Sequence, residues 1–252
     1  MKRTRILLMA FAALLSMGLI SCDKENNNNS SGNGGNNGGD NPSGGVNTNS
    51  EWVDLGLPSG LLWATCNLGA NAPEEYGNYY AWGEISPKES YKWSTYKYCT
   101  VGSVGRENWD HTLKTLTKYN TLTLYGTPDN KTVLEAMDDA ATSVLGSGAH
   151  TPTADDWREL ISNTTVEWTT VNSVNGRKFT AANGNTIFLP AAGHHWEGTG
   201  PNSAGYFGIY WSSSLRTDYP PDAMVFCFTS SEQRVDDYNR RDGNSIRAVR
   251  QK

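Results

Sequence analysis

The folded part of the chain opens on Trp52-Val53-Asp54-Leu55-Gly56-Leu57-Pro58-Ser59-Gly60-Leu61-Leu62-Trp63-Ala64-Thr65-Cys66. Apolar residues dominate both halves of this stretch, and the Pro-Ser-Gly segment between them has the composition of a turn. Short apolar runs bounded by Gly and Pro are typical of paired strands. The stretch therefore predicts two strands, residues 52–57 and 61–66, joined by a tight turn at 58–60.

Two helices are predicted in the middle of the domain. Residues 133–145 place apolar side chains at helical spacing. Thr153, followed by Asp155 and Asp156, has the pattern of a helix N-cap with an acidic first turn. The second helix is therefore expected to start at that point and to place Trp157 on its apolar face.

The other predicted elements are short strands. Two Asn-Gly pairs, at 175–176 and 183–184, predict hairpin turns, whereas residues 88–132 predict an irregular excursion with short elements. Strands are expected at 79–84, 167–171, 177–181, 186–190, 208–212, 223–228 and 245–250. Two central helices among many short, mostly antiparallel strands place the domain in the α+β class.

Residues 1–21 have the three parts of a secretory signal peptide, which are a basic start, an apolar run and small residues before the cleavage site. The apolar run is shorter than the roughly 20 residues of a membrane-spanning helix. Leu19-Ile20-Ser21-Cys22 resembles the lipobox of bacterial lipoproteins. The sequence therefore predicts lipidation at Cys22, with acyl chains such as palmitate anchoring the mature chain in a membrane.

Residues 22–50 predict a tether between this anchor and the domain. They are almost entirely Asn, Gly and Ser from residue 26 onward. Such a segment buries too little apolar surface to offset the entropy of ordering, so we expect disorder. The chain is thus divided into a signal peptide (1–21), a lipidated tether (22–50) and one folded domain (51–252).

The charge of the chain excludes one class of partner. Its formal net charge is −5, and removal of the signal peptide, which carries three basic and no acidic residues, changes it to −8. An acidic chain without a Lys/Arg cluster lacks the basic surface that binds nucleic acid. Anionic lipid head groups would repel it as well, so we expect membrane attachment through lipid alone.

Three cysteines follow the tether, so at least one is unpaired within the monomer. Cys227 lies in an apolar, strand-like run, where a thiol behaves as a small hydrophobe. A disulfide between Cys66 and Cys99 is compatible with an oxidising compartment. Sequence separation alone leaves that pairing open.

Seven stretches in sequence order resemble the Fibrobacter succinogenes major paralogous domain family. They span most of residues 52–250. The stretches are Val53-Asp54-Leu55-Gly56-Leu57-Pro58-Ser59-Gly60-Leu61-Leu62-Trp63-Ala64, Gly77-Asn78-Tyr79-Tyr80-Ala81-Trp82-Gly83-Glu84, Asp138-Asp139-Ala140-Ala141, residues 152–160, Leu189-Pro190-Ala191-Ala192-Gly193, Tyr210-Trp211-Ser212-Ser213-Ser214 and Gly243-Asn244-Ser245-Ile246-Arg247-Ala248-Val249-Arg250.

This resemblance implies a fold like that of C-type lectin-like and formylglycine-generating-enzyme-like domains. It also implies a lipoprotein or secreted surface protein of a Bacteroidetes-type bacterium, and it implies no defined activity. One departure is the stretch 149–151, where family members often carry a Trp-Arg-Met-like segment. The resemblance therefore does not extend to the segment before the second helix.

Candidate metal ligands are few. Asp236, Asp237, Asn239 and Asp242 offer oxygen donors suited to a hard cation, but their spacing is not that of an EF-hand loop. We interpret them as a solvated turn before the last strand. His194-His195, with His150 further away, lacks the spacing of a zinc site, and the calcium-binding strings of lectins do not occur. We therefore expect no metal and no cofactor.

No catalytic constellation is evident. Ser212-Ser213-Ser214 follows an aromatic pair and lacks the pattern of a nucleophile elbow. The related sulfatase-activating enzymes use a closely spaced cysteine pair, and Cys227 has no near cysteine neighbour. We therefore expect a protein that is not an enzyme.

Aromatic side chains give the remaining functional signal, because Trp and Tyr combine a flat apolar face with a polar edge. Four tryptophans lie in the stretches shared with the family and are expected in the core, namely Trp63, Trp82, Trp157 and Trp211. Trp196 and Tyr219 lie in the loop region 194–222 instead. With His195 and Asp222 they form the predicted recognition surface.

The expected function is a non-catalytic recognition module at the cell surface that binds glycan or protein. A structural or adhesive envelope subunit acting through a protein partner is the alternative, and an enzyme with an unrecognised site is the third. We expect the lipid anchor to lie in the outer membrane with the domain facing outward. The periplasmic leaflet is the alternative location.

Overall fold

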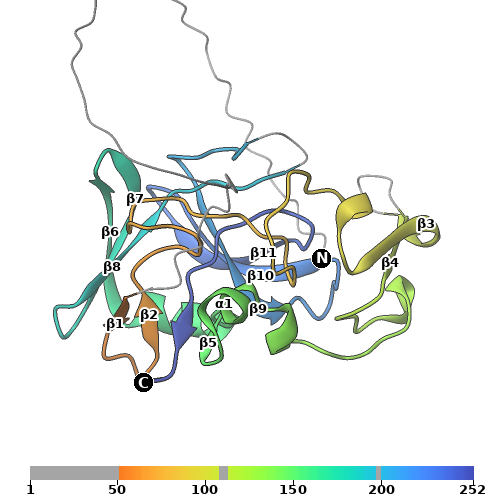
Figure 1. Cartoon of the computed structure of the whole chain (residues 1–252), viewed down its shortest axis with the longest axis horizontal. Helices are drawn as coiled ribbons and strands as arrows, with labels where there is room; N and C mark the ends of the chain where they lie inside the picture. The colour runs from red at the N-terminus through yellow and green to blue at the C-terminus, as the bar shows by residue number, and fades with distance from the viewer. Residues whose placement is uncertain (1–50, 108–112, 197–199) are drawn as a thin grey trace, which may run out of the picture. The chain divides into compact units, whose positions relative to one another are not determined.

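The computed structural model describes residues 51–107, 113–196 and 200–252. These residues contain twelve β-strands and two α-helices (Figure 1). The strands are β1 (Trp52–Asp54), β2 (Leu62–Ala64), β3 (Cys99–Glu107), β4 (Leu113–Leu116), β5 (Ala149–His150), β6 (Thr164–Val171), β7 (Val174–Ala181), β8 (Thr186–Pro190), β9 (Gly208–Leu215), β10 (Asp222–Phe228), β11 (Gln233–Asn239) and β12 (Val249–Arg250). The α-helices are α1 (Ala140–Leu145) and α2 (Ala154–Ser162). Short 3-10 helices cover Trp93–Thr95, Thr123–Tyr125 and Ala136–Asp138.

The predicted α+β class is confirmed. The strands form four small sheets with the orders β1-β2-β12-β5, β11-β10-β9, β3-β4 and β6-β7-β8, and all of these pairings are antiparallel. The signal peptide, the lipidation site Cys22 and the tether lie outside the described residues. None of the described helices has the length and apolar character needed to span a bilayer.

The sheet β11-β10-β9 separates two hydrophobic cores. Alternate side chains of a strand point to opposite faces. Tyr210 and Phe226 accordingly pack into one core with α2, whereas Trp211 and Val225 pack into the other. Because both faces of β9 and β10 are covered, both strands are buried over almost their whole length, and β10 is a nearly continuous apolar run rather than an alternating one.

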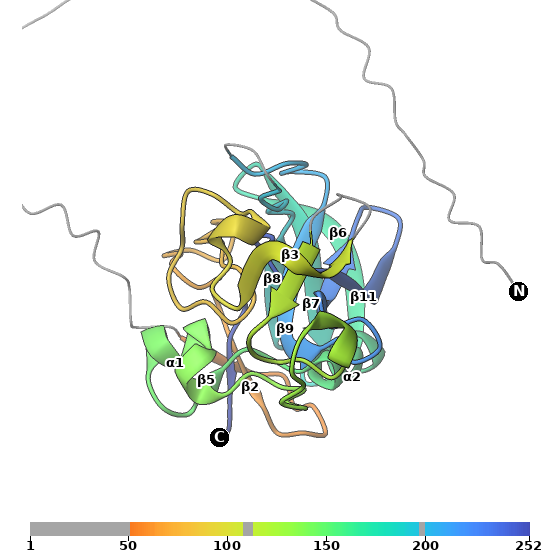
Figure 2. The ribbon, with the colours of Figure 1, turned by 90° about the vertical axis from the view of Figure 1, so that its right-hand side faces the viewer.

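Two of the sheets lie at opposite ends of the domain. Figure 1 places β6, β7 and β8 at the left and the β3–β4 hairpin at the right. Figure 2, in which the right-hand side of Figure 1 faces the viewer, places β3 in front. In both views the C-terminus lies beside β2 and β5, as expected for β12 paired between these two strands.

Helix α2 begins where the sequence predicts. The Thr153 hydroxyl accepts a hydrogen bond from the Asp156 N–H at 3.1 Å, and the Asp156 carboxylate accepts one from the Thr153 N–H at 2.7 Å. These two bonds form a capping box. The helix then buries Trp157, which stacks on Phe226 with ring centroids 5.0 Å apart and an interplanar angle of 22°. The capping box therefore sets the start of α2, and Trp157 lies on the face that meets the central sheet.

The first predicted helix is wrong over its first half. The segment 133–139 contains only a 3-10 turn, and α1 starts at Ala140. Asp139 is the reason, because its side chain accepts a hydrogen bond from the Ala141 N–H and its extended backbone makes it the N-cap. Met137, one of the residues at helical spacing, is 71% exposed.

The predicted strand 79–84 is also wrong. Only Tyr80 pairs, in an isolated bridge with Asn244. A turn follows in which the Glu84 N–H donates to the Ala81 carbonyl, and Gly83 adopts a φ of +78°. A backbone in that region favours glycine and interrupts an extended strand.

The hairpin between β6 and β7 turns three residues earlier than predicted. Asn172 and Ser173 have φ values of +46° and +69°, so they form the turn. Asn175-Gly176 lies inside β7, where a Cβ on Gly176 would come within 2.3 Å of the Leu189 carbonyl. Gly176 therefore allows β7 and β8 to approach closely and does not form a turn. The second Asn-Gly pair, 183–184, does join β7 to β8, as predicted.

Two fully buried arginines tie segments together. Arg247 donates to Asn67 Oδ1 and to the carbonyls of Ala64, Thr65 and Phe188, at 2.8–3.2 Å. Arg240 lies over the Trp82 ring at 4.8 Å and donates to the Tyr96 hydroxyl and to the carbonyls of Lys118, Tyr119 and Pro220. Each guanidinium thus joins carbonyl groups of separate chain segments through hydrogen bonds.

Candidate functional site

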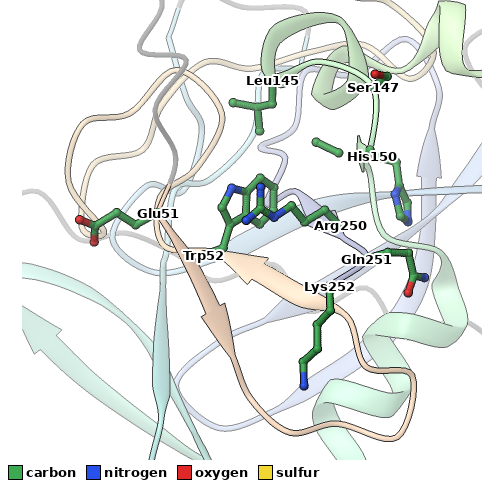
Figure 3. A pocket seen from close by; sticks show the side chains of 10 residues that line it. Glu51, Trp52, Leu145, Ser147, His150, Arg250, Gln251 and Lys252 are labelled. Carbon is green, nitrogen blue, oxygen red and sulfur yellow. The ribbon is translucent and has the colours of Figure 1, made fainter.

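A cleft of about 1050 Å³ lies where the first and last strands of the domain meet the segment between α1 and β5 (Figure 3). The residues that line it come from three stretches that are distant in sequence. They are Glu51, Trp52, Leu145, Ser147, Gly148, Ala149, His150, Arg250, Gln251 and Lys252.

Strand pairing brings the two ends of the domain together at the cleft. Leu62 of β2 lies opposite Asp54 on one side and opposite Arg250 on the other. Side chains directly opposite one another share a face, and so do residues two apart in a strand. Trp52 and Arg250 therefore project from the same face of the sheet.

The opposite face of the same sheet is buried. Trp63 and Val249 are opposite one another in register and are fully buried in the core that also contains Tyr210 and Phe226. The core thus packs against the face of the sheet that carries Trp63 and Val249. The face that carries Trp52 and Arg250 is left for the cleft.

The α1–β5 segment forms the other wall. Helix α1 ends at Leu145, and Gly146 and Gly148 then adopt φ values of +89° and +112°. Positive φ values allow the chain to reverse within a few residues, and a Cβ at either glycine would meet open space. The reversal delivers Ala149–His150 as the strand that pairs with β12.

The Trp52 indole and the Arg250 guanidinium form the centre of the cleft. The Arg250 guanidinium carbon lies 4.6 Å from the centroid of the Trp52 ring, which is the distance of a cation–π contact. Figure 3 shows Arg250 extending across the indole, with His150 and Gln251 at one side. Trp52 is half-buried and Arg250 is exposed.

Several polar groups of the cleft have no protein partner. Among the described residues, the side chains of His150, Ser147, Gln251 and Arg250 make no hydrogen bond or ion pair with another residue. Lys252 differs, because its ammonium pairs with Asp54 at 2.7 Å. This bond, together with the Gly56 N–H, lowers the pKa of Asp54. The cleft therefore offers donors that are available to a ligand.

The aromatic-loop residues predicted as a recognition surface fall into separate local environments. Tyr219 and Asp222 both contact Arg216, whose guanidinium carbon lies 5.3 Å from the Tyr219 ring and whose Nη1 lies 3.4 Å from the Asp222 carboxylate. The Asp222 carboxyl group is largely buried there. These two residues therefore join one cluster around Arg216.

His195 lies among different residues. Its ring is 4.5 Å from that of Tyr79 and 5.2 Å from that of Tyr91, and burial lowers its pKa. Burial, with the adjacent His195, also lowers the pKa of His194 to about 4. Both imidazoles are thus neutral at pH 7, which suits packing. Trp196 remains accessible, with 44% of its surface exposed.

The acidic cluster near the C-terminus is a strand rather than the predicted turn. Asp236, Asp237 and Asn239 belong to β11, which pairs with β10 over its whole length. Asp236 pairs with Arg234 at 2.8 Å, and Asp237 pairs with Arg216 at 2.7 Å. The described residues contain no group of three or more His, Cys, Asp or Glu arranged to hold a metal ion.

The cysteines of the described residues form no disulfide. Cys66 and Cys99 are half-buried. Cys227 is fully buried in β10, and burial raises the pKa of its thiol to about 12. The prediction that Cys227 acts as a small buried hydrophobe is confirmed.

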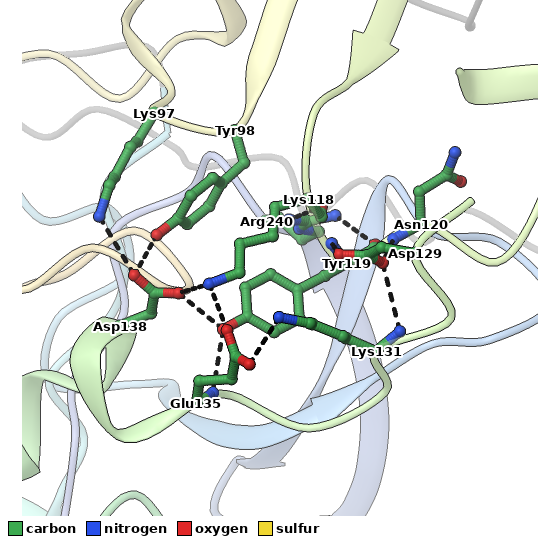
Figure 4. A network of polar contacts seen from close by, with 10 residues as sticks. All are labelled: Lys97, Tyr98, Lys118, Tyr119, Asn120, Asp129, Lys131, Glu135, Asp138 and Arg240. Atoms are coloured by element: carbon green, nitrogen blue, oxygen red, sulfur yellow. Dashed lines mark hydrogen bonds and ion pairs between the residues drawn. The ribbon is translucent and has the colours of Figure 1, made fainter. Parts of the chain in front are cut away.

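A second polar cluster surrounds Asp138 (Figure 4). Its carboxylate accepts hydrogen bonds from the Tyr98 and Tyr119 hydroxyls and from the ammonium groups of Lys97 and Lys118. Burial alone would raise the pKa of Asp138, but these four donors outweigh it and lower the pKa to about 2.

The adjoining cavity measures about 10 Å³, which is about the smallest volume that holds one water. The Asp138 cluster therefore has no room for a ligand. It fastens the 88–132 excursion to the segment before α1, and we assign it a structural role.

Comparison of the chain with protein-family models, with curated proteins and with solved structures finds no match.

Proposed function

We propose that the domain is a non-catalytic recognition module that binds glycan in the cleft between β1, β12 and the α1–β5 segment. The observation that supports this proposal is the set of cleft side chains whose polar groups no described residue uses, gathered around a tryptophan. Sugar rings combine apolar C–H faces with many hydroxyl groups. Aromatic rings and unpaired donors and acceptors are the protein groups that match this chemistry.

The size and shape of the cleft fit such a ligand. A volume of about 1050 Å³ lies at the upper end of the range of small-molecule sites. The family resemblance of the sequence, with the lectin-like fold that it implies, favours the same interpretation.

The recognition module is further proposed to be held at the bacterial outer membrane by acyl chains on Cys22, with the domain facing outward; the periplasmic leaflet is the alternative. The lipobox-like stretch and the polar segment 22–50 support this anchor. Cells that produce Cys22→Ala should release the protein into a soluble fraction, while wild-type protein stays with membranes and is shaved from intact cells by protease. Membrane retention of the Cys22→Ala protein would contradict the lipid anchor.

Glycan binding is tested with the full chain on an array of neutral and acidic glycans. We expect at least one glycan class above background, and we expect Trp52→Leu to lower its affinity at least tenfold. Leu keeps apolar bulk against the core but removes the ring.

Trp196→Leu is the matched control, because Trp196 is an exposed tryptophan outside the cleft. It should change the affinity less than twofold. Unchanged affinity of a folded Trp52→Leu protein would show that the glycan does not bind in the cleft.

One observation favours a second candidate, a structural or adhesive subunit that acts through a protein partner. Among the described strands β6 pairs only with β7, so its other edge is open over eight residues. An open edge can add a strand from another protein. Co-purification of a stoichiometric envelope protein that is lost when proline replaces Thr170, whose N–H is directed away from β7, would support this candidate over the first.

A further inference from the structure

Arg250 differs from Lys252, the other cation at the cleft, because no described residue provides its guanidinium with a counterion. No carboxylate among the described residues lies within ion-pair distance of its guanidinium, whereas Lys252 is held by Asp54. Among the described residues, the Arg250 guanidinium makes a cation–π contact with the Trp52 ring. A cation kept on a rigid aromatic surface without a counterion is available to an anionic ligand.

The stacking also orients the guanidinium. A cation–π contact uses the flat face of the group and leaves its five N–H donors directed outward in the plane. Two parallel donors at the edge of this plane match the two oxygens of a carboxylate. Trp52 thereby reduces the conformational entropy that Arg250 would lose on binding.

Among the described residues, Arg250 is the one Lys or Arg of the cleft without an ion-pair partner, and it lies on an acidic chain. Arg250 and Lys252 are the cations among its lining residues, and Glu51 is the one acidic residue among them. Figure 3 shows the Glu51 carboxylate directed away from Arg250. The formal net charge of the whole chain is −5, so most of the protein repels anions.

We propose that the cleft selects acidic glycans, and that Arg250 binds the carboxylate of a uronic acid residue in a bidentate pair. This inference rests on the proposed glycan recognition and specifies its ligand class. Trp52 supports the guanidinium from one side. Gln251, Ser147 and His150 lie in the same cleft with side chains that can bond to the ring hydroxyls.

Calorimetric titration of the full chain with trigalacturonic acid and with its methyl ester tests the proposal. The ester keeps every ring and hydroxyl group and replaces each charged carboxylate by a neutral methyl ester. We expect the acid to bind at least tenfold more tightly than the ester. Because the pair is ionic and exposed, the preference should weaken as salt is added.

Arg250→Lys separates the geometry from the charge, since lysine keeps the cation but lacks the planar pair of donors. It should lower the affinity for the acid about tenfold and leave the affinity for the ester unchanged. Arg234→Lys is the matched control, because Arg234 is a surface arginine paired with Glu232 and Asp236 on β11. It should alter neither affinity.

The outcomes distinguish this inference from the proposed function. Equal binding of acid and ester, or array binding by neutral glycans alone, would overturn the acidic preference and leave glycan recognition in place. Absence of binding by any glycan would overturn both. Competition by a triaspartate peptide as strong as that by trigalacturonic acid would show a site for carboxylates in general and would overturn the sugar class.

Discussion

Replacement of Arg247 by Met is expected to lower the free energy of unfolding by about 3 kcal/mol or more. The guanidinium is fully buried and has no carboxylate partner, and burial lowers its pKa to about 10. Its hydrogen bonds instead satisfy Asn67 Oδ1 and three backbone carbonyls. Met would relieve the buried charge but would leave these acceptors unpaired, and each unpaired buried group costs about 1–3 kcal/mol.

Denaturant unfolding measures this loss, with the midpoint and slope compared to wild type. Arg234→Met controls for a general effect of removing an arginine, because that side chain is half-exposed on β11. It should change the stability by about 0.5 kcal/mol at most. An Arg247→Met protein with the stability of wild type would show that the carbonyls of residues 64, 65 and 188 find other partners.

Replacement of Asp138 by Asn is expected to cost about 2–3 kcal/mol at pH 7. The carboxylate accepts four hydrogen bonds from Lys97, Tyr98, Lys118 and Tyr119. An amide accepts through only one oxygen, so its NH₂ group would face one or more of these donors. The 88–132 excursion would lose its main polar attachment to the segment before α1.

The same residue predicts a pH dependence. The pKa of Asp138 is lowered from 3.8 to about 2 in the folded state. A lowered carboxyl pKa contributes stability that is present above the unfolded-state value near 3.9 and is lost as the pH falls toward 2. Wild type should therefore lose about 2 kcal/mol more than Asp138→Asn between pH 4.5 and pH 2. Parallel stability curves for the two proteins would contradict the assigned network.

The sequence alone predicts an element correctly where the residues that determine it lie close together in the chain. Thr153 and Asp156 cap α2 as their spacing indicates, because both partners of the capping box lie within one turn. The apolar runs of β9 and β10 are equally local, although the sequence does not show that both of their faces are covered. The α+β class follows from such signals.

Errors arose where a distant contact decides the conformation. Asn175-Gly176 has the composition of a turn, but Gly176 lies opposite Pro190 of β8, where the Leu189 carbonyl leaves no room for a Cβ. The strand β11 was missed because its charges pair with Arg216 and Arg234 rather than with solvent. Asp139 caps α1, and its carboxylate also accepts from the Thr151 N–H, which lies twelve residues away.

The cleft was missed for the same reason. Trp52 and Arg250 stand at the two ends of the domain, and both lie in segments predicted as strands. Their contact depends on β12 pairing with β2, which no periodicity in either strand indicates. The prediction of Trp196 as a recognition residue follows from loop composition, which indicates exposure but not a shared site.

The central claim, that ligand binds at Trp52 and Arg250, is tested most directly by NMR of the tryptophan indole N–H groups during a glycan titration. The full chain contains nine tryptophans, and single Trp→Phe variants assign their signals. The Trp52 indole makes no hydrogen bond to the described residues, so a ligand in the cleft should shift its signal in proportion to saturation. We predict that the Trp52 signal moves while that of Trp196 stays. Movement of Trp196 with an unchanged Trp52 would contradict the account and return the site to the 194–222 loop.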